Sequence, residues 1–184
     1  MWWVTANSVA IAIAASQSYL TFGGGLPHLI ADGLIVGLLQ GLALRGLVRF
    51  PSWVVLTISA LGLAVVAGVG TVVAVGSLFA SAGQANSDFY VVLSYGLAAA
   101  VAGLVGGFVQ GVTLPSDRRL LPWLLASACG APFVFPALVF SWVEAGTATA
   151  PLPAWAVGML GGLVYGVISG IGLLRSLRPT KSIA

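Results

Sequence analysis

Few side chains in this sequence have the chemistry of a catalytic or ligand-binding group. The 184 residues include four acids, one histidine and one cysteine. His28 precedes Asp32 by four positions, so both side chains share one face if this segment is helical, where they could exchange a proton. Because acids are stabilised at helix N-termini, we interpret the two residues as an interfacial ion pair. Asp32 and Glu144 are also candidates for a function in the outer membrane zone.

The residue types that enzymes and metal sites need are otherwise missing from the sequence. Cys129 has no second cysteine for a disulfide bond, and no spacing of cysteine and histidine suits a metal ion. Serine-based proteolysis inside a membrane needs a buried histidine or lysine near a serine, and the chain offers none. A net charge of +3 without a basic stripe argues against nucleic-acid binding. We therefore expect no enzyme activity, no metal ion and no nucleic-acid partner.

A second group of candidates consists of small polar and amide side chains inside apolar segments. Three of them follow a tryptophan by four positions, and three follow a pair of glycines. They are Asn7, Gln40, Thr57, Gln110, Ser127 and Ser169. An amide that faces lipid lacks hydrogen-bond partners, so the two glutamines are expected to point inward and to bond to the polar residues that follow the tryptophans. This layer predicts either packing between helices or contact with a solute.

Three residues are weak candidates for cofactor binding: Gln40, Gln110 and His28. A glutamine carbonyl oxygen could ligate the magnesium of a chlorophyll, because hard cations take oxygen ligands. An aromatic cluster near the fifth apolar segment could flank a carotenoid, a quinone or a lipid, and packing against lipid is the simpler explanation. It consists of Phe133, Phe135, Phe140 and Trp142. Nothing in the spacing requires a pigment, so we predict no cofactor.

The composition indicates which elements carry these residues. Hydrophobic residues make up 59% of the chain and charged residues 6%, against about 25% charged in soluble domains. The sequence therefore predicts an integral membrane protein. Six apolar stretches approach the length of about 20 residues that crosses a bilayer. They run from Trp2 to about Phe22, Pro27 to about Leu47, Trp53 to about Phe79, Phe89 to about Leu114, Leu121 to about Trp142, and Pro153 to about Leu174.

The basic residues predict the orientation of these spans. They lie after the second, fourth and sixth stretches: Arg45, Arg49, Arg118, Arg119, Arg175, Arg178 and Lys181. Lys and Arg are retained on the cytoplasmic side, so both termini are expected in the cytoplasm, in a bacterial plasma or thylakoid membrane. The tryptophans that begin the odd stretches are expected at the cytoplasmic interface, with the indole N–H in water and the ring in lipid.

The sequence contains an internal repeat. The pattern Gly-x3-Gly-x2-Gln-x3-Leu occurs in the second and fourth stretches, and the sixth has Ser169 in place of glutamine. Its glycines are Gly33, Gly37, Gly103, Gly107, Gly162 and Gly166. Glycines four apart let helix backbones approach closely. We therefore predict one all-α transmembrane domain over 1–184, built from three helical hairpins (about 1–49, 50–118 and 119–177) in a pseudo-threefold bundle, in which the glycine stripes favour a closed axis over an open pore. A short cytoplasmic tail (178–184) follows.

The third hairpin departs from the repeat. Pro132 and Pro136 interrupt the fifth stretch, and each proline removes an amide donor and clashes with the carbonyl four residues before it. A kink or break is therefore expected there, and broken spans mark binding sites in some transporters.

The repeated pattern, followed by arginine and then by Trp-x3-Ser, resembles uncharacterised small multi-pass membrane proteins of cyanobacteria and other bacteria. In that group a tryptophan and a run of arginines often follow the glutamine, whereas Gly41 and Gly111 follow it here. The resemblance covers most of the chain. It implies a multi-pass fold and supplies no activity.

Three functions are compatible with these features. The first is a non-enzymatic accessory or assembly subunit of a larger membrane complex, with the bilayer and other membrane subunits as partners, because the chain has short loops and no catalytic set. The resemblance suggests a photosynthetic complex as one host. The second is a transporter or channel for a small solute or a lipid-like molecule, and the third is a pigment- or quinone-binding protein.

Overall fold

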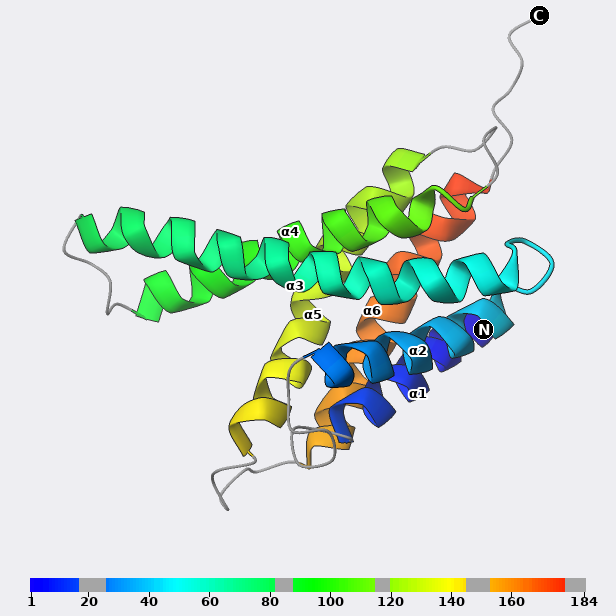
Figure 1. Ribbon diagram of the computed structural model, residues 1–184, viewed down its shortest axis with the longest axis horizontal. Helices are drawn as coiled ribbons and strands as arrows, with labels where there is room; N and C mark the ends of the chain where they lie inside the picture. Colours follow the sequence, from blue (N-terminus) through cyan, green and yellow to red (C-terminus); the bar gives the residue numbers. More distant parts are fainter. Residues whose placement is uncertain (17–25, 82–87, 115–119, 145–152, 178–184) are drawn as a thin grey trace, which may run out of the picture.

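The computed structural model describes residues 1–16, 26–81, 88–114, 120–144 and 153–177. These residues form six α-helices, so the predicted all-α fold is confirmed (Figure 1). The helices are α1 (Trp2–Ser16), α2 (Leu26–Ala43), α3 (Phe50–Ser81), α4 (Asp88–Gly111), α5 (Leu120–Glu144) and α6 (Ala154–Ser176). By length and composition, three helical segments of the described chain could cross a membrane: Phe50–Ser81, Val92–Gly111 and Trp155–Ser176.

Prolines affect the helices less than the sequence suggested. α3 begins at Phe50, three residues before the expected start, because Pro51 lies in the first turn, where no amide donor is needed. Of the kink or break expected at Pro132 and Pro136, the break is wrong, since α5 is one continuous helix from Leu120 to Glu144, and the kink stays a prediction. Each proline removes a single backbone donor, and packing in the surrounding bundle is enough to maintain the helix.

The described helices form a closed ring. Each helix packs against the next one along the chain, and α6 packs against both α5 and α1. The starts of α1, α3 and α5 and the ends of α2, α4 and α6 lie together at one end of the molecule, which we call the tryptophan end (Figure 1). At the opposite end, the far end, α3 and α4 diverge from the other four helices (Figure 1).

Glycine pairs make the same kind of contact at three interfaces of this ring. A Cβ atom at Gly33 would lie 2.8 Å from Cα of Ile58, so α2 meets α3 backbone to backbone. On α4, a Cβ at Gly107 would lie 2.7 Å from Cβ of Ser127 on α5, and the neighbouring Gly103 also contacts Ser127. Gly37, Gly162 and Gly166 make the corresponding contacts, the last two with α1. Each even helix therefore packs through glycine against the odd helix that follows it around the ring.

Candidate functional site

Three tryptophans close the ring at the tryptophan end. Trp3, Trp53 and Trp123 are 0 to 8% exposed and meet edge to face, with ring centroids 5.8 to 6.4 Å apart. Leu44, Leu114 and Leu173, which end the repeated pattern, pack against them. The expectation that the rings face lipid and the indole N–H groups face water is therefore wrong, because all three side chains are buried against protein. Three indoles that meet at one point bury more apolar surface against protein than they could at the edge of the bundle.

The indole N–H groups of this tryptophan cluster have unequal partners. Nε1 of Trp3 donates to Oγ of Ser169 at 3.0 Å, and Nε1 of Trp123 donates to the carbonyl of Gly107 at 2.8 Å. Nε1 of Trp53 is buried and has no hydrogen-bond acceptor among the described residues. The cluster is therefore anchored to α6 and α4 by hydrogen bonds, whereas its third member is held by packing.

A layer of buried polar side chains lies one helical turn inside the tryptophan cluster. Within the first hairpin, Nε2 of Gln40 donates to Oδ1 of Asn7 at 2.8 Å. Within the second, Nε2 of Gln110 donates to Oγ1 of Thr57 at 3.1 Å. Gln110 also donates to Oε1 of Gln40 at 3.1 Å, which joins the two pairs. The inward orientation and the bonds expected from the sequence are present for both glutamines.

The same layer is completed differently on the side of the third hairpin. Ser169 accepts the indole N–H of Trp3 and donates to the carbonyl of Tyr165 at 2.6 Å. Ser127 is buried where Gly103 and Gly107 of α4 pack against it. Serine side chains thus occupy the positions that carry amides or threonine in the other hairpins. Ser169 is held by hydrogen bonds, whereas Ser127 lies in a close contact between helices.

The sequence did not predict one repeated contact, which joins a glycine of each even helix to a tryptophan. A third glycine follows each glycine pair by four residues: Gly41, Gly111 and Gly170. A Cβ atom at these positions would lie 3.1 to 3.4 Å from Cδ1 of the tryptophan on the next odd helix around the ring. The spacing was visible in the sequence, but only burial of the tryptophans gives these glycines a partner.

Beyond the polar layer the helices border a half-open cavity of about 450 Å³. Residues from all six helices line it, and most are Val, Leu, Ala or Gly. Gln40, Thr57 and Gln110 lie at one end of it, and Asp32, Tyr95 and Tyr165 are further polar residues of its lining. At the tryptophan end the packed indoles close the axis of the ring. Toward the far end, α3 and α4 stay together and diverge from the other four helices (Figure 1).

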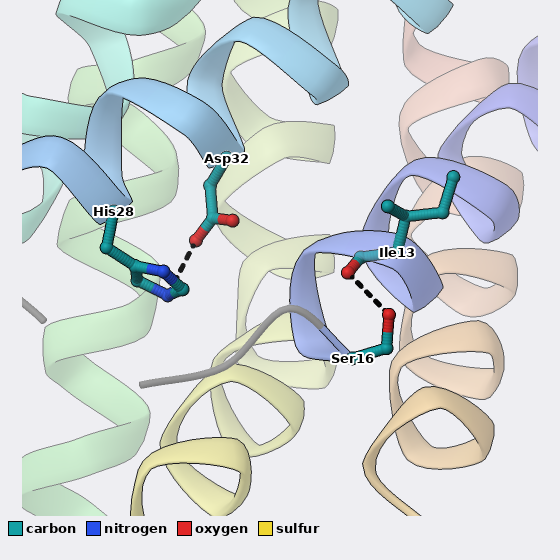
Figure 2. A network of polar contacts seen from close by, with 4 residues as sticks. All are labelled: Ile13, Ser16, His28 and Asp32. Carbon is teal, nitrogen blue, oxygen red and sulfur yellow. Dashed lines mark hydrogen bonds and ion pairs between the residues drawn. The ribbon is translucent and has the colours of Figure 1, made fainter. Parts of the chain in front are cut away.

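The pairing expected between His28 and Asp32 is present near the start of α2. Nε2 of His28 lies 3.2 Å from Oδ2 of Asp32 (Figure 2). The two residues are only 2% and 5% exposed, so the pair is buried against protein, and its place at the membrane interface stays a prediction. Packing of α2 into the ring turns this face of the helix inward, and Asp32 becomes part of the cavity lining.

Several other candidates do not contribute to this site. Phe133 is exposed on α5, and Cys129 is exposed as well. The side chains of Phe135, Pro136, Phe140, Trp142 and Glu144, together with Arg118, Arg119, Arg178 and Lys181, lie outside the described residues. Within the part of the chain that the structure describes, no three His, Cys, Asp or Glu side chains gather as a metal site would require.

The site is thus an apolar cavity between helices, with a hydrogen-bonded polar layer at one end and a buried carboxylate in its wall. Comparison of the chain with models of protein families, with curated proteins and with solved structures finds no match.

Proposed function

We propose that this chain is a small membrane transporter that binds a lipid-like molecule in the cavity between its helices. The observation that carries the proposal is the cavity of about 450 Å³, which falls in the range of roughly 300 to 1,000 Å³ typical of small-molecule sites. Its walls are apolar, and its polar residues are few and grouped. Such a lining favours an apolar body with a small number of hydrogen-bonding groups.

The proposal includes six crossings of the bilayer by three hairpins around a pseudo-threefold axis. The recurring glycine contacts and the three meeting tryptophans support the axis. Arg45 and Arg49 follow α2, and Arg175 lies in the last turn of α6. All three are near the tryptophan end, so this end faces the cytoplasm. In the most apolar stretch of α3 only 11% of the residues are buried inside the protein, and lipid covers the others.

In this arrangement the cavity is closed toward the cytoplasm. The tryptophan cluster and the polar layer lie between it and the tryptophan end, while α3 and α4 diverge at the far end. A binding site closed on one side is what one state of an alternating transporter requires.

Two other functions stay predictions from the sequence. An accessory subunit would need a protein partner on the exposed helix faces, and lipid accounts for those faces equally well. A pigment or quinone site at Phe133 would need that side chain to face a cavity, and it faces outward. Neither is carried by a specific contact.

Photo-crosslinking tests the proposal. A long-chain hydrocarbon probe that carries a diazirine is added to membranes containing the protein, and labelled peptides are mapped by mass spectrometry. We expect labelling of cavity residues of α3 such as Leu61 and Val65, besides the lipid-facing surface. Ala64→Phe should reduce the cavity labelling at least tenfold, because Ala64 lines the cavity and the ring of the new side chain fills it.

Val66→Phe is the matched control. It makes a similar change two residues away, where the side chain is 70% exposed and does not line the cavity. Cavity labelling should be unchanged in this variant. If Ala64→Phe labels like the unmodified protein, or if cavity residues are never labelled, the proposal is wrong.

A further inference from the structure

The carboxylate of Asp32 is a buried acceptor that is only half satisfied. Its side chain is 7% exposed, and one oxygen, Oδ2, is bonded to His28. The other oxygen, Oδ1, is buried and has no hydrogen-bond donor among the described residues. Figure 2 shows that the second oxygen points away from the imidazole ring. Since Asp32 also lines the cavity, a donor inside the cavity is the natural partner of this carboxylate.

An unpaired carboxylate oxygen in such surroundings is energetically unfavourable. Burial of a polar group without a hydrogen bond costs about 1 to 3 kcal/mol in proteins, and the cost is greater for a charged group. Ionisable residues inside membrane bundles are therefore retained mostly where they have a function. The described lining of the cavity contains no lysine or arginine that could neutralise Asp32.

The position of Asp32 fits the polar end of an elongated ligand. Asp32 and Gln40 are on the same helix, eight residues apart, which is about 12 Å at a rise of about 1.5 Å per residue. Gly33 and Val36 lie between them and also line the cavity. The wall of α2 thus has a carboxylate near the far end and an apolar surface leading to the polar layer.

We propose that Asp32, oriented by His28, binds an O–H or N–H group of the lipid-like molecule that occupies the cavity. The inference rests on the proposed function and specifies its ligand as an apolar molecule with a hydrogen-bond donor at one end. Asp32 is the binding residue. His28 is a positioning residue, because its bond to Oδ2 keeps Oδ1 directed at the ligand.

The test compares probes that differ only in the polar end. Diazirine probes with the same alkyl chain carry a terminal hydroxyl group, an amino group or no polar group, and labelling of cavity residues such as Leu61 is quantified. The unmodified protein should label at least tenfold more efficiently with the hydroxyl or amino probe than with the hydrocarbon. Asp32→Ala should abolish this preference and leave hydrocarbon labelling unchanged.

Three further variants separate binding from a loss of structure. Asp32→Asn keeps an acceptor oxygen, so it should retain part of the preference for the hydroxyl probe. His28→Gln keeps an N–H donor for Oδ2 and should preserve the preference, whereas His28→Ala should weaken it. If Asp32→Ala does not fold, these variants still test whether Asp32 binds the polar end of the probe.

The outcomes distinguish this inference from the proposed function. If the hydrocarbon labels the cavity but the three probes label equally, the role of Asp32 is wrong and the cavity proposal stands. The role is equally wrong if the full preference survives in Asp32→Ala or, where that variant does not fold, in Asp32→Asn. If no probe labels the cavity, the proposed function fails first.

Discussion

At the scale of single residues, the tryptophan cluster offers an internal comparison. Trp53 and Trp123 are both fully buried and follow the repeated pattern at the same distance, yet only Trp123 donates a hydrogen bond. Replacing either residue by phenylalanine removes a similar amount of ring surface. The difference between the two variants therefore isolates the bond to the carbonyl of Gly107.

We expect Trp123→Phe to lower the free energy of unfolding by about 1 to 2 kcal/mol more than Trp53→Phe, because it removes a hydrogen bond to the carbonyl of Gly107, whereas Trp53→Phe removes a buried N–H that has no acceptor among the described residues. Unfolding in mixed micelles with increasing sodium dodecyl sulfate measures both values. Equal destabilisation of the two variants would mean that the bond at Trp123 contributes nothing.

The sequence predicted the polar residues better than the aromatic ones. Gln40 and Gln110 have one favourable place in a membrane protein, which is inside the bundle, and their spacing indicated their partners. A tryptophan is stable both at a membrane interface and in a packed core. Whether a tryptophan lies at the interface or in the core depends here on whether the three tryptophans of different hairpins meet. No single segment of the sequence contains this long-range information.

At the scale of helices, the glycine pairs determine how closely neighbours approach. A Cβ atom at Gly33 would lie 2.8 Å from the backbone of Ile58, so Gly33→Ala must push α2 away from α3. We expect a loss of about 1 to 3 kcal/mol of stability, the usual cost of overpacking a tight contact. Gly62→Ala is the control, because a Cβ atom there would have no neighbour within 4 Å. The same unfolding measurement should leave this control within about 0.5 kcal/mol of the unmodified protein.

The membrane orientation gives a prediction for the helix ends. Single cysteines at Trp2, Leu47, Ser81 and Pro153 lie at exposed positions in the described chain, and Cys129→Ala provides the background. Since Arg45 and Arg49 adjoin Leu47, the first two should react with a membrane-impermeant maleimide only from the cytoplasmic side. The last two should react only from the opposite side. Labelling of Leu47→Cys and Ser81→Cys from the same side would contradict a crossing by α3.

Helix positions followed from apolar length, but the course of α5 through its prolines did not. Proline is unfavourable by about 3 kcal/mol in an isolated helix interior, and this local penalty led us to expect a kink or a break at Pro132. The observed helix is continuous because a residue inside a bundle is also held by its neighbours, and Gly130, two residues earlier, packs directly against Tyr165 of α6. A local rule cannot include that contact.

At the scale of the whole molecule, the two ends of the ring differ in how firmly they are held. The tryptophan cluster, the polar layer and three glycine interfaces join all six helices at one end. Toward the far end, α3 and α4 hold each other, with Phe79 packing against Phe89 and Tyr90. The cavity lies between this pair and the other helices, a feature that the repeat could not predict because its three copies suggested equal hairpins.

This asymmetry predicts that the molecule moves at its far end. Spin labels at Ser81 and Ile30 report the distance between α3 and α2 there, and labels at Leu47 and Leu121 report the tryptophan end. In a Cys129→Ala background, pulsed electron spin resonance should give a broad distance distribution for the first pair and a narrow one for the second. An alkyl alcohol that occupies the cavity should narrow the first distribution, because it adds contacts where the helices lack them. Broadening confined to the tryptophan end would contradict this account, since it would mean that the buried indoles and amides form the weaker end of the ring.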